Sequence, residues 1–402
     1  MQHACLRGAR FLRNQSAVSQ RHIGSPSPWW RRHPLVLCGN CVPERHSHVN
    51  QTRNFTPLSQ RTACSPVRPT RSLSSEASDN DAAFLTIPPF ASEVLRGMGQ
   101  VLFCNSPLSG ALIMGGLCVG DPCLAGLALV GSASATATAH AAGVDKGVIR
   151  DGLMGYNGAL VGCAFSVFLP YTIELQALAT VTGSAASAVL AQKLGGWTAP
   201  VPQWTLAFNI IALAAFALVQ PFGEAQAEDV QQPEESGTEI SVADWCGGLF
   251  SGVSQIFVVS NPLSGLLILG GIASISPLAA VATLVGSLVG LVSGAVVGAD
   301  ANDLKAGIWG YNPALTALAV SIFFVPLGWP FMALACGGAA ITTLIFIGMK
   351  VAVASAIQAP CLTLPFCAAA SACFLMGGRH AGLVHARVPH SPEANLRAYR
   401  AL

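Results

Sequence analysis

The stretch 152-GLMGYNGALVG-162 is almost repeated at 307-GIWGYNPALTA-317. Tyr156 and Tyr311 occupy equivalent places in the two copies, at an offset of 155 in the numbering. Each is followed four positions later by a leucine, Leu160 or Leu315. Because positions i and i+4 share one face of a helix, each copy predicts an aromatic ring beside a leucine. Ordinary packing between helices is the simpler interpretation of one such pair, but its recurrence favours a shared function.

Two further phrases repeat in the same order. The stretch 100-QVLFCNSPLSG-110 is matched by 255-QIFVVSNPLSG-265, again at an offset of 155. The stretch 199-APVPQWTLAFN-209 resembles 359-APCLTLPFC-367, where Thr205 and Thr363 correspond at an offset of 158. Three matches in one order predict an internal duplication with one short insertion, and equivalent residues of the two halves are then expected to behave alike.

The duplication divides the chain into five regions. The repeated halves are predicted at 84–221 and 240–379, with a linker at 222–239, a leader at 1–80 and a basic tail at 380–402. The linker contains six acidic residues and no basic one, which is typical of a polar connection between two apolar regions.

The composition predicts an all-α, polytopic membrane protein. The chain is 52% hydrophobic and 10% charged, with a mean hydropathy of +0.54. Since about 20 apolar residues cross a bilayer as a helix, the apolar stretches after residue 84 supply many candidate spans. The lipid bilayer is therefore the expected partner, and a net charge of +2 gives no indication of nucleic acid binding.

Each half is predicted to hold about five spans, together with the short stretch that leads into GYN. An odd number of spans turns the second half upside down, so we expect an inverted repeat with its axis in the membrane plane. The charges agree, because the basic leader and tail then share one face and the acidic linker lies on the other.

The leader has two open interpretations. Eleven of the 21 Lys and Arg side chains lie before Ser75, together with the single acid Glu44. Such an Arg- and Ser-rich, acid-poor segment is typical of an organellar transit peptide, which would be removed near Ser74. A disordered cytoplasmic tail fits the same composition. The membrane in which the protein works depends on this choice.

Paired polar residues mark a candidate path through the membrane. Gln100 and Gln255 carry amides that are costly in a span unless they are hydrogen-bonded, either between helices or at the mouth of a path. Thr205 and Thr363 follow proline-containing stretches and begin apolar segments. They are interpreted either as helix N-caps or as hydroxyls facing a water-filled cavity, where irregular backbone is tolerated at membrane depth.

The residues of the predicted spans argue against several functions. They hold no arginine series for voltage sensing, no carboxylate relay for proton coupling and no phosphate-binding loop. Of the 13 cysteines, Cys38 and Cys41 form a lone CxxC in the leader, and nine others are scattered through apolar segments. We assign these nine to packing and predict neither a metal nor a cofactor. A path of amides, hydroxyls, carbonyls and ring faces suits a small, neutral, planar solute.

These phrases together resemble the urea transporter family, and the resemblance covers about residues 90–380. It implies an inverted repeat of five spans and one tilted, half-membrane pore helix per half, assembled as a homotrimer with one pore per protomer in the plasma membrane. It also implies passive, channel-like transport of urea, with no enzymatic activity.

The resemblance assigns roles to particular residues. Gln100 and Gln255 would contact urea at the two ends of the pore, and Thr205 and Thr363 would mark its narrow centre. Apolar slots that stack a flat solute would be formed by Phe103, Tyr156, Leu160, Tyr311 and Leu315. The second half carries Val258 where the first has Phe103, so unequal slots are expected. Further departures are Ser106 opposite Asn261 and Ala207 opposite Pro365.

Other functions remain open at this stage. A channel for ammonia, water or a urea analogue would use similar groups, although a water channel of the two-NPA type would need a second intact motif and a pore arginine. An intramembrane enzyme is disfavoured because His140 is the sole histidine between residues 49 and 379. A structural scaffold would leave the paired polar residues unexplained.

Overall fold

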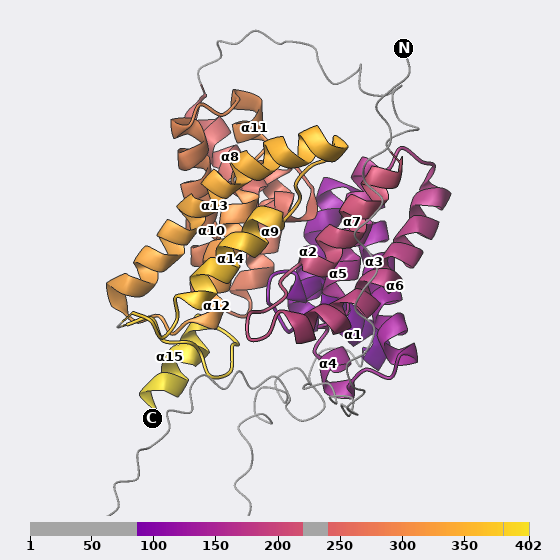
Figure 1. Ribbon diagram of the computed structural model, residues 1–402, viewed down its shortest axis with the longest axis horizontal. Coiled ribbons are helices and arrows are strands. Elements are labelled where there is room, and N and C mark those ends of the chain that lie inside the picture. The colour runs from indigo at the N-terminus through magenta and orange to yellow at the C-terminus, as the bar shows by residue number, and fades with distance from the viewer. Residues whose placement is uncertain (1–86, 220–239, 381, 402) are drawn as a thin grey trace, which may run out of the picture.

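The computed structural model describes residues 87–219, 240–380 and 382–401, so the predicted leader and the predicted linker lie outside the described residues. The described chain is helical, and the isolated bridge between Phe324 and His385 is its one β-type pairing. Two groups of helices lie side by side, one from each half of the chain, and the C-terminal helix lies at the bottom of the view (Figure 1).

Seven helices form the first group. They are α1 (Pro89–Gln100), α2 (Pro107–Gly120), α3 (Pro122–Ala141), α4 (Lys146–Arg150), α5 (Tyr156–Phe168), α6 (Ile173–Trp197) and α7 (Leu206–Val219). The second group consists of α8 (Val242–Ser254), which continues into the 3₁₀ turn Gln255–Phe257, then α9 (Pro262–Ala273), α10 (Pro277–Val296), α11 (Ala301–Lys305), α12 (Tyr311–Phe323), α13 (Gly328–Ile357) and α14 (Leu364–Leu375). The last helix is α15 (Pro392–Arg400).

The order of helices recurs from one half to the other. The starts of α2, α3 and α5 match those of α9, α10 and α12 at the offset seen for GYN, and the start of α7 matches that of α14 at the offset seen for the threonines. Equivalent residues also cap them. Ser106 accepts a hydrogen bond from the Ser109 N–H at the start of α2, and Asn261 accepts one from the Ser264 N–H at the start of α9. The Ser-for-Asn departure therefore keeps the cap, since both residue types serve at this position.

The chain bends sharply between the first two helices of each half. In the second half, α8 and α9 are inclined by 70°. Phe103 and Val258 lie at the equivalent bends with φ angles of 58° and 63°. This is a left-handed backbone conformation that residues other than glycine rarely adopt. The i,i+3 spacing of Gln100 and Phe103 predicts that they share one helix face. That prediction is wrong, because α1 ends at Gln100 and Phe103 lies in this turn.

Helix length limits which segments cross a membrane alone. Among the described residues, four helices are long and apolar enough (α3, α6, α10 and α13), or five if the bent pair α8–α9 counts as one span. The 13-residue α5 and α12 are each about 20 Å long, less than the ~30 Å hydrocarbon core. A crossing at these places includes the turns beside the helix, and five spans per half stays a prediction.

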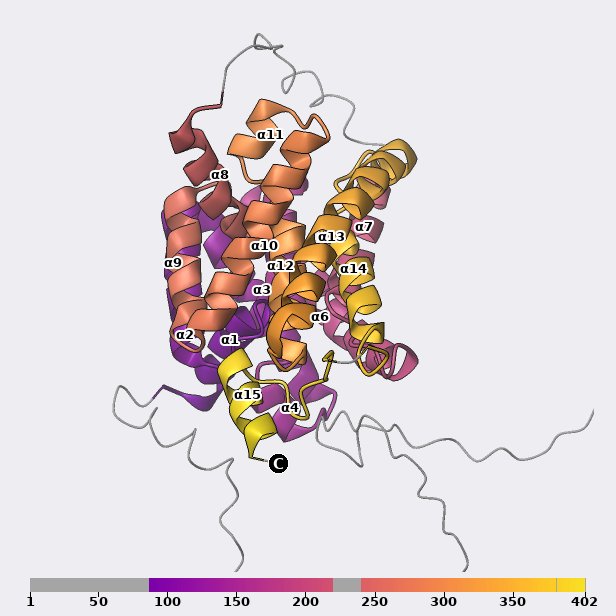
Figure 2. The ribbon, with the colours of Figure 1, turned by 90° about the vertical axis from the view of Figure 1, so that its left-hand side faces the viewer.

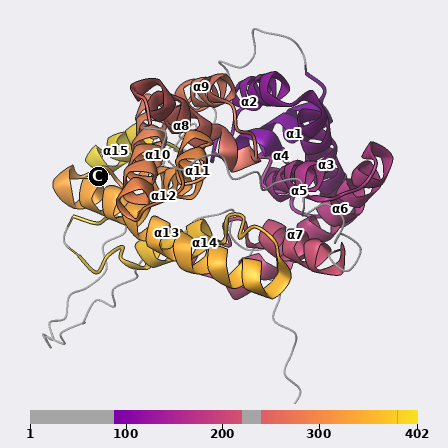
Figure 3. The same ribbon diagram turned by 90° about the horizontal axis from the view of Figure 1, so that it is seen from above.

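The two halves meet along two seams. Seen from above, α2 lies beside α9 on one side of the molecule and α7 lies near α14 on the other (Figure 3); a second view also shows α2 beside α9 (Figure 2). Small residues allow the close approach at the first seam, where Ser109 Oγ donates to the Gly271 carbonyl at 2.8 Å. One buried apolar cluster contains side chains of both halves, among them Phe208 and Phe366.

The basic tail, predicted at 380–402, folds back against the second half. Glu393 accepts hydrogen bonds from Ser276 Oγ at 2.6 Å and from the Leu278 N–H at 2.9 Å, and so caps the start of α10. The buried Asn395 donates to the Ile322 carbonyl at the end of α12. These contacts give the tail a fixed place beside the ends of two apolar helices.

Candidate functional site

The two predicted glutamines make equivalent contacts. Gln100 Nε2 donates to the Asp151 carbonyl at 2.7 Å, and Gln255 Nε2 donates to the Ala306 carbonyl at 3.1 Å. Each carbonyl precedes a glycine with positive φ, at residues 152 and 307. The glutamine therefore joins the end of the first helix of its half to the turn before GYN. Both side chains are half-buried, and their amide oxygens take no part in this bond.

The two tyrosines also make equivalent contacts. Tyr156 Oη donates to the Trp204 carbonyl and Tyr311 Oη donates to the Leu362 carbonyl, each at 2.7 Å. Trp204 and Leu362 have φ angles of 52° and 51°. Strained residues of this kind persist where their surroundings fix them, often at functional sites. Here the phenol holds the strained turn that precedes each threonine.

The asparagines of the two GYN phrases, absent from the predicted site, support the same turns. Asn157 Oδ1 accepts from the Phe208 N–H and Asn312 Oδ1 from the Phe366 N–H, both at 3.2 Å. Asn312 Nδ2 also donates to the Leu362 carbonyl, whereas Asn157 Nδ2 is buried without a partner among the described residues. Their repetition beside the tyrosines was the signal that could have identified them.

Thr205 and Thr363 meet at the junction of the two halves. Their hydroxyl oxygens are 2.7 Å apart, and both residues are buried. The N-cap interpretation is wrong for both hydroxyls. They bond each other and neighbouring side chains, and α14 has no side-chain cap from Thr363. Asn209, another residue missed at the sequence level, donates to Thr363 Oγ1 at 2.9 Å.

Apolar side chains surround these polar contacts. Leu160 and Leu315 are each 1% exposed, one on α5 and the other on α12. Unequal slots stay a prediction. Phe103 lies among aromatic rings. Its ring centroid lies 5.8 Å from Phe323 and 6.3 Å from Trp204, both edge-on. The second half has the aliphatic residues Val258 and Leu362 at the positions of Phe103 and Trp204, and Phe346 there packs against Trp309 and Tyr311 instead.

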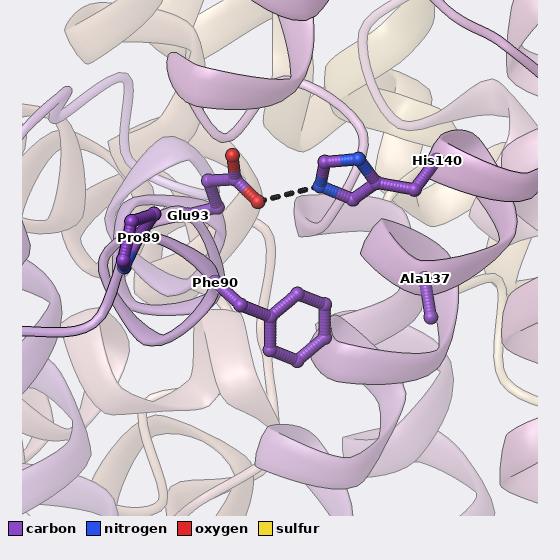
Figure 4. A pocket seen from close by; sticks show the side chains of 5 residues that line it. All are labelled: Pro89, Phe90, Glu93, Ala137 and His140. Atoms are coloured by element: carbon purple, nitrogen blue, oxygen red, sulfur yellow. Dashed lines mark hydrogen bonds and ion pairs between the residues drawn. The ribbon is translucent and has the colours of Figure 1, made fainter.

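One hollow of the first half contains a pair of titratable side chains. The hollow in Figure 4 is lined by Pro89, Phe90, Glu93, Ala137 and His140. Within it, His140 Nε2 lies 2.7 Å from Glu93 Oε2. The equivalent positions of the second half hold Gly248 and Ala295, so this pair has no counterpart there. The described residues contain no group of three or more His, Cys, Asp or Glu side chains that could hold a metal ion.

The fold and the contacts define a class of protein. An all-α membrane protein whose two halves repeat the same polar contacts and meet at a buried pair of hydroxyls has the architecture of a membrane transporter.

The chain belongs to the urea transporter family, whose family model, described as "Urea transporter", matches residues 91–378. It is 31% identical over 293 residues to "Urea transporter 1" of Rattus norvegicus, which covers 70% of this chain and 75% of the relative. It is 32% identical over 292 residues to "Urea transporter 1" of Ovis aries, with the same coverage. The family is one of transporters and not of enzymes.

Proposed function

We propose that this protein is a passive, channel-like pathway for urea. One observation carries the proposal: two equivalent sets of uncharged contacts, each made by a glutamine and a tyrosine, lead to one pair of hydrogen-bonded threonines. Urea is small, planar and neutral, with N–H donors and one carbonyl acceptor, so hydroxyls and backbone carbonyls can replace its water shell without a charge.

The threonine pair forms the narrow centre of the proposed path. Because the two hydroxyls bond each other at 2.7 Å, a solute passing between them must take the place of that bond. Urea offers both donors and an acceptor in exchange, so the exchange costs little. A solute without hydrogen-bonding groups leaves two buried hydroxyls unpaired, at about 1–3 kcal/mol for each. The centre therefore selects for hydrogen-bonding capacity.

The remaining predicted residues line the path on either side of this centre. Gln100 and Gln255 meet the solute near the two ends, where their half-buried amides retain hydrogen-bonding capacity beyond the bond to the GYN turn. Apolar slots that hold the flat solute are formed by Phe103, Tyr156, Leu160, Val258, Tyr311 and Leu315. The aromatic cluster around Phe103 makes one slot more rigid than the other.

The proposed architecture is an inverted repeat with a half-membrane pore helix in each half. The helices that contain Ala207 and Pro365, α7 and α14, suit this role, since they contain 14 and 12 residues and are about 20 Å long, shorter than the ~30 Å hydrocarbon core. Inversion of the second half places its glutamine at the opposite mouth from that of the first half.

We also propose a homotrimer with one path in each protomer, by analogy with the family. The outward helices carry large exposed apolar side chains, such as Leu178, Leu288 and Leu344, which need lipid or another protomer against them. Native mass spectrometry in mild detergent tests the assembly, and a monomer as the sole species would contradict it. The plasma membrane is the expected location, and the mitochondrial inner membrane or a plastid replaces it if N-terminal sequencing finds a mature start near Ser74.

Urea entry into vesicles tests the proposed function. Vesicles with purified protein, mixed rapidly with isosmotic urea, should swell faster than protein-free vesicles, and the rate should be proportional to the amount of folded protein. Water and ammonia permeability measured on the same vesicles identify the competing channels. Equal urea rates with and without protein would refute the proposal.

A further inference from the structure

The narrow centre contains two further buried side chains that differ between the halves. Asn209 lies four positions after Thr205 on α7, and Cys367 lies four positions after Thr363 on α14. The two positions are equivalent under the repeat, yet one is an amide and the other a thiol. Asn209 is 0% exposed and Cys367 is 4% exposed. The repeat therefore breaks chemically at the place where the two threonines meet.

Backbone hydrogen bonding fixes the orientation of the Asn209 amide. The Thr363 N–H donates to Asn209 Oδ1 at 3.1 Å. A backbone N–H can only donate, so the atom that it contacts must be the amide oxygen. Asn209 Nδ2 is then the donor, and its two hydrogens point to the Thr205 carbonyl at 2.8 Å and to Thr363 Oγ1 at 2.9 Å.

This orientation gives the hydroxyl bonds a direction. Thr363 Oγ1 already accepts a hydrogen bond from Asn209 Nδ2. For the hydroxyl hydrogen of Thr363, the sole acceptor among the described residues is Thr205 Oγ1, at 2.7 Å. We assign the hydrogen of Thr205 to Cys367 Sγ at 3.2 Å; Asn209 Nδ2 also lies 3.3 Å from Thr205 Oγ1. Sulfur is a weak acceptor, so the chain of donors runs from Asn209 through the two threonines and ends on its weakest bond.

We infer that Asn209 is a positioning residue that makes the two threonines different: Thr205 supplies the movable donor for the carbonyl oxygen of the permeating solute, and Thr363 acts as an acceptor. This inference rests on the proposed function. When urea arrives, Thr205 exchanges an O–H···S bond for a stronger O–H···O bond to the urea carbonyl. Thiourea has the same shape but carries a sulfur at that position, so the exchange brings it no comparable gain.

The ratio of urea to thiourea flux tests the inference. Replacing Thr205 by Val should lower that ratio about 2- to 10-fold, the effect of one hydrogen bond. Thr363→Val should slow both solutes and leave the ratio unchanged, because Thr363 contacts N–H groups that both solutes share. Urea and thiourea differ in size, but this difference cancels because the flux ratio of each variant is divided by the flux ratio of the wild type. Equal changes of the ratio in the two variants would overturn the inference.

Two further variants keep the test decisive if a valine variant folds poorly. Cys367→Ser is almost isosteric and gives Thr205 a stronger resting acceptor, so the ratio should fall. The double exchange Asn209→Cys with Cys367→Asn should reverse the chain and make Thr363 the residue that sets the ratio. An unchanged ratio in Cys367→Ser would contradict the assignment of Thr205. Failure of wild-type protein to carry urea would refute the proposed function itself, which separates the two outcomes.

Discussion

Removing the hydroxyl from each of the two tyrosines should destabilise the protein to different extents. Tyr156→Phe deletes the 2.7 Å bond to the Trp204 carbonyl, and Tyr311→Phe deletes the equivalent bond to the Leu362 carbonyl. The Leu362 carbonyl retains a second bond from Asn312 Nδ2 at 3.1 Å. No other side-chain or turn donor among the described residues reaches the Trp204 carbonyl.

The expected magnitudes follow from this difference. A buried carbonyl left without a partner costs about 1–3 kcal/mol, whereas losing one bond of a carbonyl that keeps another costs about 0.5–1.5 kcal/mol. Hydrogen bonds within membrane proteins average about 0.6 kcal/mol in double-mutant cycles, so the lower ends of these ranges are the safer guide. Tyr156→Phe should therefore be the more destabilising change.

Reversible unfolding in mixed detergent measures the two free energies of unfolding directly. Tyr171 is 40% exposed, and Tyr171→Phe is the matched control, expected within about 0.5 kcal/mol of wild type. An equal loss in both variants, or a larger loss in Tyr311→Phe, would show that the Asn312 bond does not support the Leu362 carbonyl as described.

Three further changes have defined outcomes. Gly155→Ala should destabilise the protein by about 1–3 kcal/mol because its new Cβ would lie 2.7 Å from Ser132 Oγ; thermal unfolding compares it with Gly126→Ala, which meets nothing within 4 Å and should not destabilise. Glu393→Gln should weaken the capping of α10 and speed trypsin cleavage of the tail, and unchanged cleavage would count against that docking. Burial lowers the pKa of His385 below its ordinary value of 6.5, although a backbone hydrogen bond partly opposes this shift. The folded state therefore binds fewer protons than the unfolded state, and stability should be lost as the pH falls through 6.5; a melting temperature with the same pH dependence in His385→Phe would refute this assignment.

The sequence predicted the larger features because they leave repeated or compositional signals. The helical membrane class follows from apolar stretches, and the spacing of the three repeated phrases identified Gln100, Tyr156 and Thr205 with their partners. A near-constant offset between the phrases says which positions are equivalent. It does not say which atoms touch, and so the direct bond between Thr205 and Thr363 and their loss of an N-cap role appear only in three dimensions.

Other features depend on long-range contacts that leave no local pattern. Asn209 resembles any polar residue near a helix start, and its role depends on the N–H of Thr363, which belongs to the other half of the chain. The left-handed turn at Phe103 arises where two helices must meet at a steep angle, and local spacing instead suggested a continuous helix. The tail was predicted from its charge alone, whereas its position is set by Glu393 and Asn395.

The dependence of urea flux on ion gradients tests the central claim most directly. Purified wild-type protein in vesicles should carry urea down its concentration gradient at a rate that is the same with sodium and proton gradients imposed, reversed or dissipated by ionophores. The matched contacts that we assign to the path contain no charged side chain to couple the solute to an ion. Urea flux that stops when the ion gradients are dissipated, or urea accumulation above the external concentration, would contradict the account.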